Sequence, residues 1–141
     1  MKTRTWQDIA GWFIEQEPMD HMKLASLVYL AYAWFLTLNG ERLYKEAVFE
    51  ALPVMIAEKN LFAKYHRYGK QKIKLLKSNV LELEIQVFLR SVYDTYAAAD
   101  GEGLAAYLRQ STPYQRARQR KEDFLISEAE MIAYYEKQIH A

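Results

Sequence analysis

The chain has no cysteine and only three histidines in 141 residues, and its formal net charge is +1. Without cysteine it has neither a disulfide framework nor a thiol nucleophile. His21, His66 and His140 lie far apart and lack the close ligand spacing of transition-metal sites, so we expect no metal. A charge so close to zero also excludes a general polyelectrolyte role.

Motifs for common catalytic chemistry are missing as well. There is no phosphate-binding Walker loop, no serine stands in a G-x-S-x-G context, and the paired glutamates have an i, i+2 spacing that separates them on a helix. Residues 101–106 match the G-x-G-x-x-A dinucleotide pattern, but a predicted helix precedes them where that motif needs a strand. We therefore expect a turn between helices there, and neither an enzyme nor a bound cofactor.

The longest apolar run, Leu24–Leu38, is too short for a membrane span, which needs roughly 20 residues. It is apolar almost all the way round, as expected for a helix in the centre of a core. Asp20 can cap its start and Gly40 can end it. The first 16 residues contain no hydrophobic region of the signal-peptide kind, so the expected location is the cytoplasm, without a membrane.

The remaining periodicity predicts a mainly α fold. We expect one compact helical bundle over 1–141 around a central buried helix at about 21–38, with one or two short β segments. The predicted flanking helices lie at about 5–16, at 53–69 and at 81–96, the last with an Asn79–Glu82 capping box. Short helices are expected after Asp100 and Pro113, and a last helix begins at a Ser127–Glu130 capping box. The expected extended segments lie near 47–49 and 70–77.

Charge and aromatic residues indicate the candidate binding surfaces. Residues 61–77 contain six basic side chains and no acid, and a second basic stretch spans 109–121. The chain also has 11 Tyr, 6 Phe and 3 Trp, and Tyr, Trp and Arg are enriched where proteins bind proteins. The first basic segment could instead contact nucleic acid, or be a solvated face. The candidate partner-binding residues are Tyr65, Arg67, Tyr68, Lys70, Tyr114, Arg116 and Arg118.

One set of motifs resembles a known family. Lys23-Leu24, the run Leu27–Gly40 and Leu43-Tyr44 are similar to the opening of Panacea domains, which include SocA-like and GepA-like phage-associated proteins. Further matches follow in order at 53–54, 62–69, 96–108, 111–118 and 126–127, so the resemblance covers about residues 20–138. The motif positions, for which we expect mostly structural roles, are Lys23, Leu24, Tyr29, Trp34, Gly40, Leu43, Pro53, Gly69 and Pro113.

The resemblance implies an antitoxin of a toxin–antitoxin system. Many Panacea proteins neutralise a cognate toxin by direct binding, and those toxins include small alarmone synthetase-like enzymes that modify tRNA. SocA-like members instead act as adaptors that deliver their toxin to a protease. A proteolytic adaptor and a nucleic-acid-binding regulator using residues 61–77 are the alternatives, and the oligomeric state is open. We expect the central helix to support the binding surface without contacting the partner.

Overall fold

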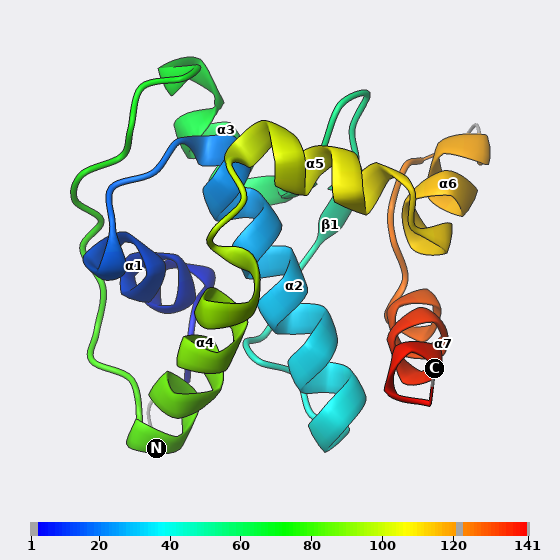
Figure 1. The fold of residues 1–141 in the computed structure, drawn as a ribbon, viewed down its shortest axis with the longest axis horizontal. Helices are drawn as coiled ribbons and strands as arrows, with labels where there is room; N and C mark the ends of the chain where they lie inside the picture. The colour runs from blue at the N-terminus through cyan, green and yellow to red at the C-terminus, as the bar shows by residue number, and fades with distance from the viewer. Residues whose placement is uncertain (1–2, 121–122, 141) are drawn as a thin grey trace.

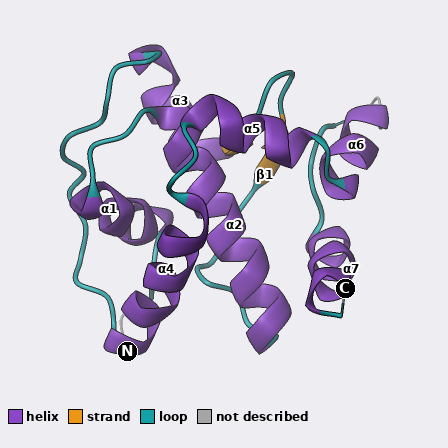
Figure 2. Cartoon of the chain, in the orientation of Figure 1, coloured by secondary structure: helices purple, strands orange, loops and turns teal. Residues whose placement is uncertain are grey.

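The computed structural model describes residues 3–120 and 123–140 and confirms a compact, mainly α single domain (Figure 1). Figure 2 shows that helices dominate and that strands are confined to one short hairpin. In chain order the elements are α1 (Trp6–Gln16), α2 (His21–Asn39), β1 (Phe49–Ala51), β2 (Ile56–Glu58), α3 (Lys59–Tyr65), the 3₁₀ helix η1 (His66–Tyr68), α4 (Leu83–Tyr96), α5 (Gly101–Arg109), α6 (Thr112–Gln119) and α7 (Glu128–Ile139).

Helix α2 runs through the middle of the molecule, as predicted (Figure 1). It packs against α1, α4, α5, α7 and the hairpin, and residues 24–33 are all buried. An apolar surface on every side of a helix is favourable only when other elements enclose it, because each Å² removed from water contributes about 25 cal/mol. Asp20 accepts from the Lys23 amide at 2.8 Å, and Gly40 ends the helix with a φ of 68°.

The other predicted helix starts are largely confirmed. Thr5 and Asp8 form a reciprocal capping box at α1, and Ser127 and Glu130 form one at α7. Asp100 accepts from the Gly103 amide at 2.7 Å, so the glycines of the G-x-G-x-x-A match lie in the first turn of α5. No strand precedes them within the described residues 83–100. The expected turn between helices lies at residues 97–100, just before the match, and residues 101–106 are themselves helical.

The predicted helix over 53–69 is wrong over residues 53–58. Pro53 lies in the turn of an antiparallel hairpin, where β1 pairs Phe49 with Glu58 of β2, and the helix begins only at Lys59. Glu58 explains this start, because its carboxylate accepts from the amides of Asn60 and Leu61 at 2.8 and 3.2 Å. A proline is compatible with both a first helical turn and a hairpin turn, so its presence did not decide between them.

Two further predictions need correction. Residues 70–77 form no regular strand; Ile73 makes a single antiparallel bridge with Met19. The Asn79–Glu82 capping box is also absent, since α4 begins at Leu83 and Glu82 makes no side-chain cap. The Asn79 amide instead donates to the carboxylate of Asp8 at 2.9 Å. A capping carboxylate of α1 thus determines the path of the chain before α4.

Candidate protein-binding surface

Four aromatic side chains from four helices meet on one face of the molecule. We call Trp34, Tyr96, Tyr107 and Tyr134 the aromatic surface; they come from α2, α4, α5 and α7. The Trp34 indole N–H donates to the Tyr96 hydroxyl at 2.9 Å, and the Tyr96 and Tyr107 ring centroids lie 6.1 Å apart. Buried Tyr135 connects the rest, with centroids 5.0 Å from both Trp34 and Tyr134. These contacts fix the rings in one cluster.

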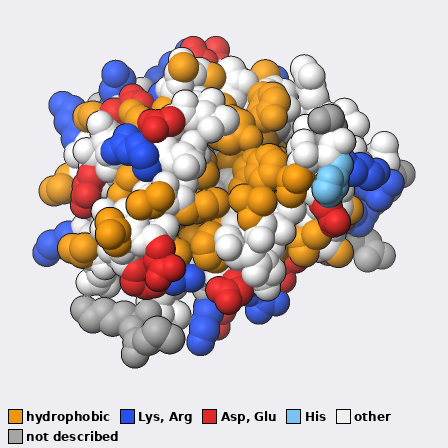
Figure 3. Space-filling view, turned by 60° about the horizontal axis from the view of Figure 1, so that its bottom comes forward, with side chains coloured by type: hydrophobic (Ala, Val, Ile, Leu, Met, Phe, Trp, Pro, Cys, Tyr) orange, Lys and Arg blue, Asp and Glu red, His pale blue; other side chains and the backbone are white. Residues whose placement is uncertain are grey.

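An apolar groove continues from the aromatic surface along α2 and α4. It has a volume of about 210 Å³, and its walls include Trp34, Leu38, Phe88 and Val92. Leu38 is 56% exposed and Tyr107 is 49% exposed. Figure 3 shows hydrophobic side chains gathered over the middle of this face. The last turns of α2 therefore reach the surface, contrary to the expectation that this helix lies entirely inside the core.

The groove is uncharged as well as apolar. Its two polar wall residues, Ser91 and Thr95, donate their hydroxyls to carbonyls of α4, at Val87 and Ser91 respectively. Burial raises the pKa of the Tyr96 hydroxyl and of the Tyr134 hydroxyl, so both stay neutral at physiological pH. This face can bury apolar side chains of a partner, but it provides no group for acid–base chemistry.

Two of the seven candidate partner-binding residues are not at the surface. Tyr65 is 4% exposed and Tyr114 is 7% exposed, which corrects the expectation that both rings are free. The Tyr114 hydroxyl donates to the carbonyls of Leu52 and Pro53 at 2.6 and 3.0 Å. This ring therefore holds the turn of the hairpin.

The other five candidates divide between two places. Arg67, Tyr68 and Lys70 are exposed around η1, whereas Arg116 is exposed on α6. Arg118, also on α6, is half-buried; it donates to the Ala51 carbonyl at 3.1 Å and lies 4.3 Å from the centroid of the Phe124 ring. None of the candidates lines the apolar groove. Lys121, in the second basic stretch, lies outside the described residues.

Most residues that carry the resemblance to Panacea domains are buried or have structural roles in turns. Lys23, Leu24, Tyr29, Leu43 and Pro113 are buried, Trp34 is half-buried, Pro53 is exposed in the hairpin turn, and Gly40 and Gly69 have φ values of 68° and 57°. The buried ammonium of Lys23 donates to Glu17 at 3.1 Å and to the Ala97 carbonyl at 2.7 Å. It thereby ties the start of α2 to the end of α4.

A larger cleft of about 620 Å³ lies between residues 42–49 on one side and Arg120 with residues 123–130 on the other. Two ion pairs lie along it: Arg42 bonds Glu128 at 2.9 Å, and Arg120 bonds Glu130 at 3.0 Å. Hydrogen bonds from Arg42, joined by one from Tyr32, lower the pKa of Glu128. These carboxylates are charged and paired, so they are poorly suited to act as general acids or bases.

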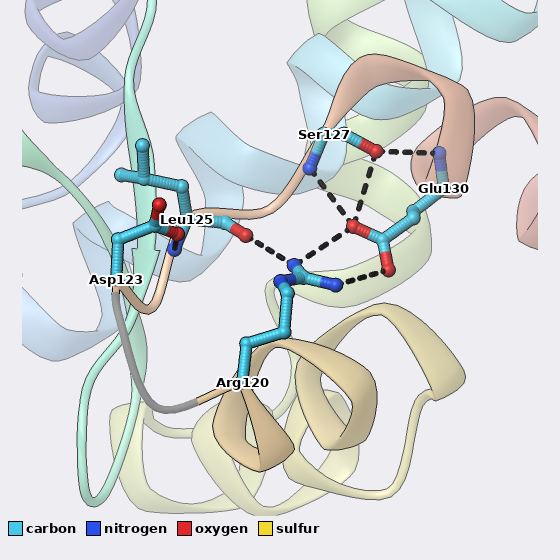
Figure 4. Close-up of polar contacts among 5 residues, drawn as sticks. All are labelled: Arg120, Asp123, Leu125, Ser127 and Glu130. Carbon is cyan, nitrogen blue, oxygen red and sulfur yellow. Dashed lines mark hydrogen bonds and ion pairs between the residues drawn. The ribbon is translucent and has the colours of Figure 1, made fainter.

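Along the same cleft, residues 124–126 pair with β1 in the manner of a short third strand. The Ala51 amide donates to the Phe124 carbonyl at 2.7 Å, and the Ile126 amide donates to Phe49 at 2.9 Å. Figure 4 shows how the backbone of Leu125 between them is satisfied: its amide donates to Asp123 at 3.0 Å, and its carbonyl accepts from Arg120. The outward-facing backbone groups of this edge are thus bonded by side chains.

Neither a metal cluster nor a membrane-crossing helix occurs in the described ranges 3–120 and 123–140. Comparison of the sequence with models of protein families finds no match, and comparisons with curated proteins and with solved structures find none either.

Sequence reasoning missed Tyr96, Tyr107 and Tyr134 as surface residues. Each falls at the edge of an apolar helix face, a position that core and surface residues share. The missing information was that α4 and α7 stand on either side of α2 and leave part of it uncovered (Figure 1).

Proposed function

We propose that this protein is an antitoxin that binds a toxin protein through the aromatic surface and the adjoining groove. The observation that carries the binding role is the cluster of Trp34, Tyr96, Tyr107 and Tyr134, held together by contacts across four helices. The nature of the partner rests on the resemblance to Panacea domains. The toxin would be inhibited by occlusion, with no reaction catalysed by this chain.

Physical arguments support a protein partner at this face. Protein interfaces are enriched in aromatic residues and depleted of charge at their centre, and the groove wall contains no charged side chain. Trp and Tyr bury large areas for few rotatable bonds, and a few such residues supply most of the binding energy. The rings are also preorganised by their mutual contacts, which lowers the entropy lost on binding.

Co-expression with the product of the neighbouring gene tests the biological role. We expect the neighbour alone to arrest growth and this protein to restore it. Growth that is normal with the neighbour alone contradicts the proposal. Restoration that disappears in strains lacking a particular protease, together with a longer toxin half-life there, identifies a proteolytic adaptor in place of occlusion.

A pair of tyrosine variants tests the surface itself. Tyr107→Ala should weaken toxin binding by about tenfold or more, since truncating an aromatic anchor at an interface typically costs about 2 kcal/mol. Tyr68→Ala is the matched control, because Tyr68 is 43% exposed, close to the 49% of Tyr107, and belongs neither to the aromatic surface nor to the groove. Calorimetric titration of both variants decides the matter; a loss confined to Tyr68→Ala would place the toxin around η1 instead.

A further inference from the structure

One segment of the chain concentrates its positive charge. Residues 59–77, the lysine segment, contain six lysines and one arginine and no acidic residue. Removing these seven charges from the formal total of +1 leaves −6 for the rest of the chain. The balanced overall charge therefore conceals a strongly basic region beside an acidic remainder.

The cations of the lysine segment face solvent and are little used inside the protein. Lys59, Lys64, Arg67, Lys70, Lys72, Lys74 and Lys77 are all exposed. Among the described residues, only Lys70 takes part in an ion pair, with Glu102 at 3.3 Å, and those side chains are 90% and 73% exposed. Such an exposed pair contributes little to stability. The charges remain available to an anionic ligand.

Four of these cations, Lys70, Lys72, Lys74 and Lys77, lie on an irregular loop that is anchored at one point. After η1 the chain leaves regular structure and runs along the outside of the molecule towards α4 (Figure 1). Ile73 anchors it, because its amide and carbonyl both bond Met19, at 2.7 and 3.3 Å. Ile73 is buried between the exposed Lys72 and Lys74, as expected where side chains alternate along an extended chain. The ligand that fits is itself linear and repeatedly charged.

The residue types distinguish a nucleic acid from an acidic protein. Lysine is depleted in protein–protein interfaces, where arginine and aromatic residues predominate, whereas lysine side chains commonly neutralise phosphates along a nucleic-acid backbone. Tyr68, 43% exposed and adjacent to Arg67, provides a ring on which a base can stack. We infer that the lysine segment binds the phosphate backbone of a single-stranded nucleic acid, independently of the aromatic surface.

Fluorescence anisotropy with a labelled oligouridine of about 20 nucleotides tests this inference on the full chain. Affinity should fall as salt rises, with a log–log slope of about −0.7 for each phosphate neutralised. The triple variant Lys70→Gln, Lys72→Gln, Lys74→Gln should therefore have a slope smaller in magnitude by about 2. Tyr68→Ala should lower the affinity at least about fivefold through lost stacking.

The matched control removes three exposed cations elsewhere: Lys45→Gln, Arg116→Gln and Lys137→Gln. It changes the net charge equally and should retain the wild-type slope. Equal loss in both triple variants, or no binding at low salt, overturns the inference. Equal or tighter binding of a polyglutamate of matched charge, or of vesicles of anionic lipid, also overturns it in favour of an acidic protein or a membrane surface.

Discussion

The two basic stretches of this chain both lack acidic residues but have different structural roles. The lysine segment leaves its cations in solvent, whereas the arginine stretch, Arg109 to Arg120, uses most of them on the protein itself. Arg109 donates to the Val54 carbonyl at 2.7 Å, Arg118 donates to Ala51 at 3.1 Å, and Arg120 pairs with Glu130. The net charge of a segment therefore does not show whether its cations are free to bind a partner or are bonded to other groups of the same chain.

The difference follows from side-chain chemistry. A guanidinium has five donors in a planar arrangement and can satisfy carbonyls at a turn while it packs on an aromatic ring, as Arg118 does on Phe124. An ammonium is a strongly hydrated point charge on a flexible stem. Arg109 of α5 and Arg118 of α6 consequently hold the β1–β2 hairpin through its carbonyls, and no lysine of the lysine segment makes a comparable bond within the described residues.

Removing the central ring of the arginine stretch should have the largest effect. Tyr114→Ala should lower the free energy of unfolding by about 3–5 kcal/mol, because a buried aromatic side chain is lost. Tyr114→Phe keeps the ring and should cost only about 1 kcal/mol for the hydroxyl bonds to the hairpin turn. Urea unfolding followed by circular dichroism measures both; equal costs would show that the ring itself contributes nothing.

The arginines provide a sharper version of the same comparison. Arg118→Ala should cost about 1–2 kcal/mol in unfolding free energy through the lost carbonyl bond and ring contact. Arg116→Ala, two residues earlier on α6 and exposed, should change it by less than about 0.5 kcal/mol. If the two variants unfold at the same urea concentration, the bracing role assigned to Arg118 is wrong.

His21 is a basic group buried next to the lysine segment, in a cleft that Lys70 and Gly69 also line. Burial lowers the pKa of His21; Asp20 opposes the shift and His66 adds to it. Below the ordinary histidine pKa of about 6.5, the unfolded chain binds a proton that the folded chain resists, so stability falls as pH decreases. His21→Gln should remove this component from a pH series of melting temperatures, and exposed His140→Gln should retain it.

The smallest effect is expected in the lysine segment. Lys72→Ala should alter the free energy of unfolding by less than about 0.5 kcal/mol, because an exposed side chain without an ion pair is removed. The measurement is again urea unfolding, with Arg118→Ala as the reference. If Lys72→Ala lowers the free energy of unfolding as much as Arg118→Ala does, both basic stretches stabilise the fold and the proposed difference between them is wrong.

Local signals in the sequence predicted most of the helices. The central helix, the capping boxes of α1 and α7 and the cap of α5 all depend on residues within four positions of one another. The hairpin at Pro53 could not be predicted this way, because Tyr114, 61 positions later, holds its turn. The aromatic surface likewise depends on which parts of α2 its neighbours leave uncovered, and that is a property of packing alone.

The bonded edge at Leu125 has a consequence for how the molecule behaves in a crowded solution. Strand edges normally offer free amides and carbonyls that recruit strands from other chains and so begin aggregation. Here Asp123 occupies the outward amide and Arg120 the outward carbonyl. Since Glu130 holds Arg120 in place from the first turn of α7, a helix that contributes Tyr134 to the aromatic surface also protects this strand edge against unwanted strand addition.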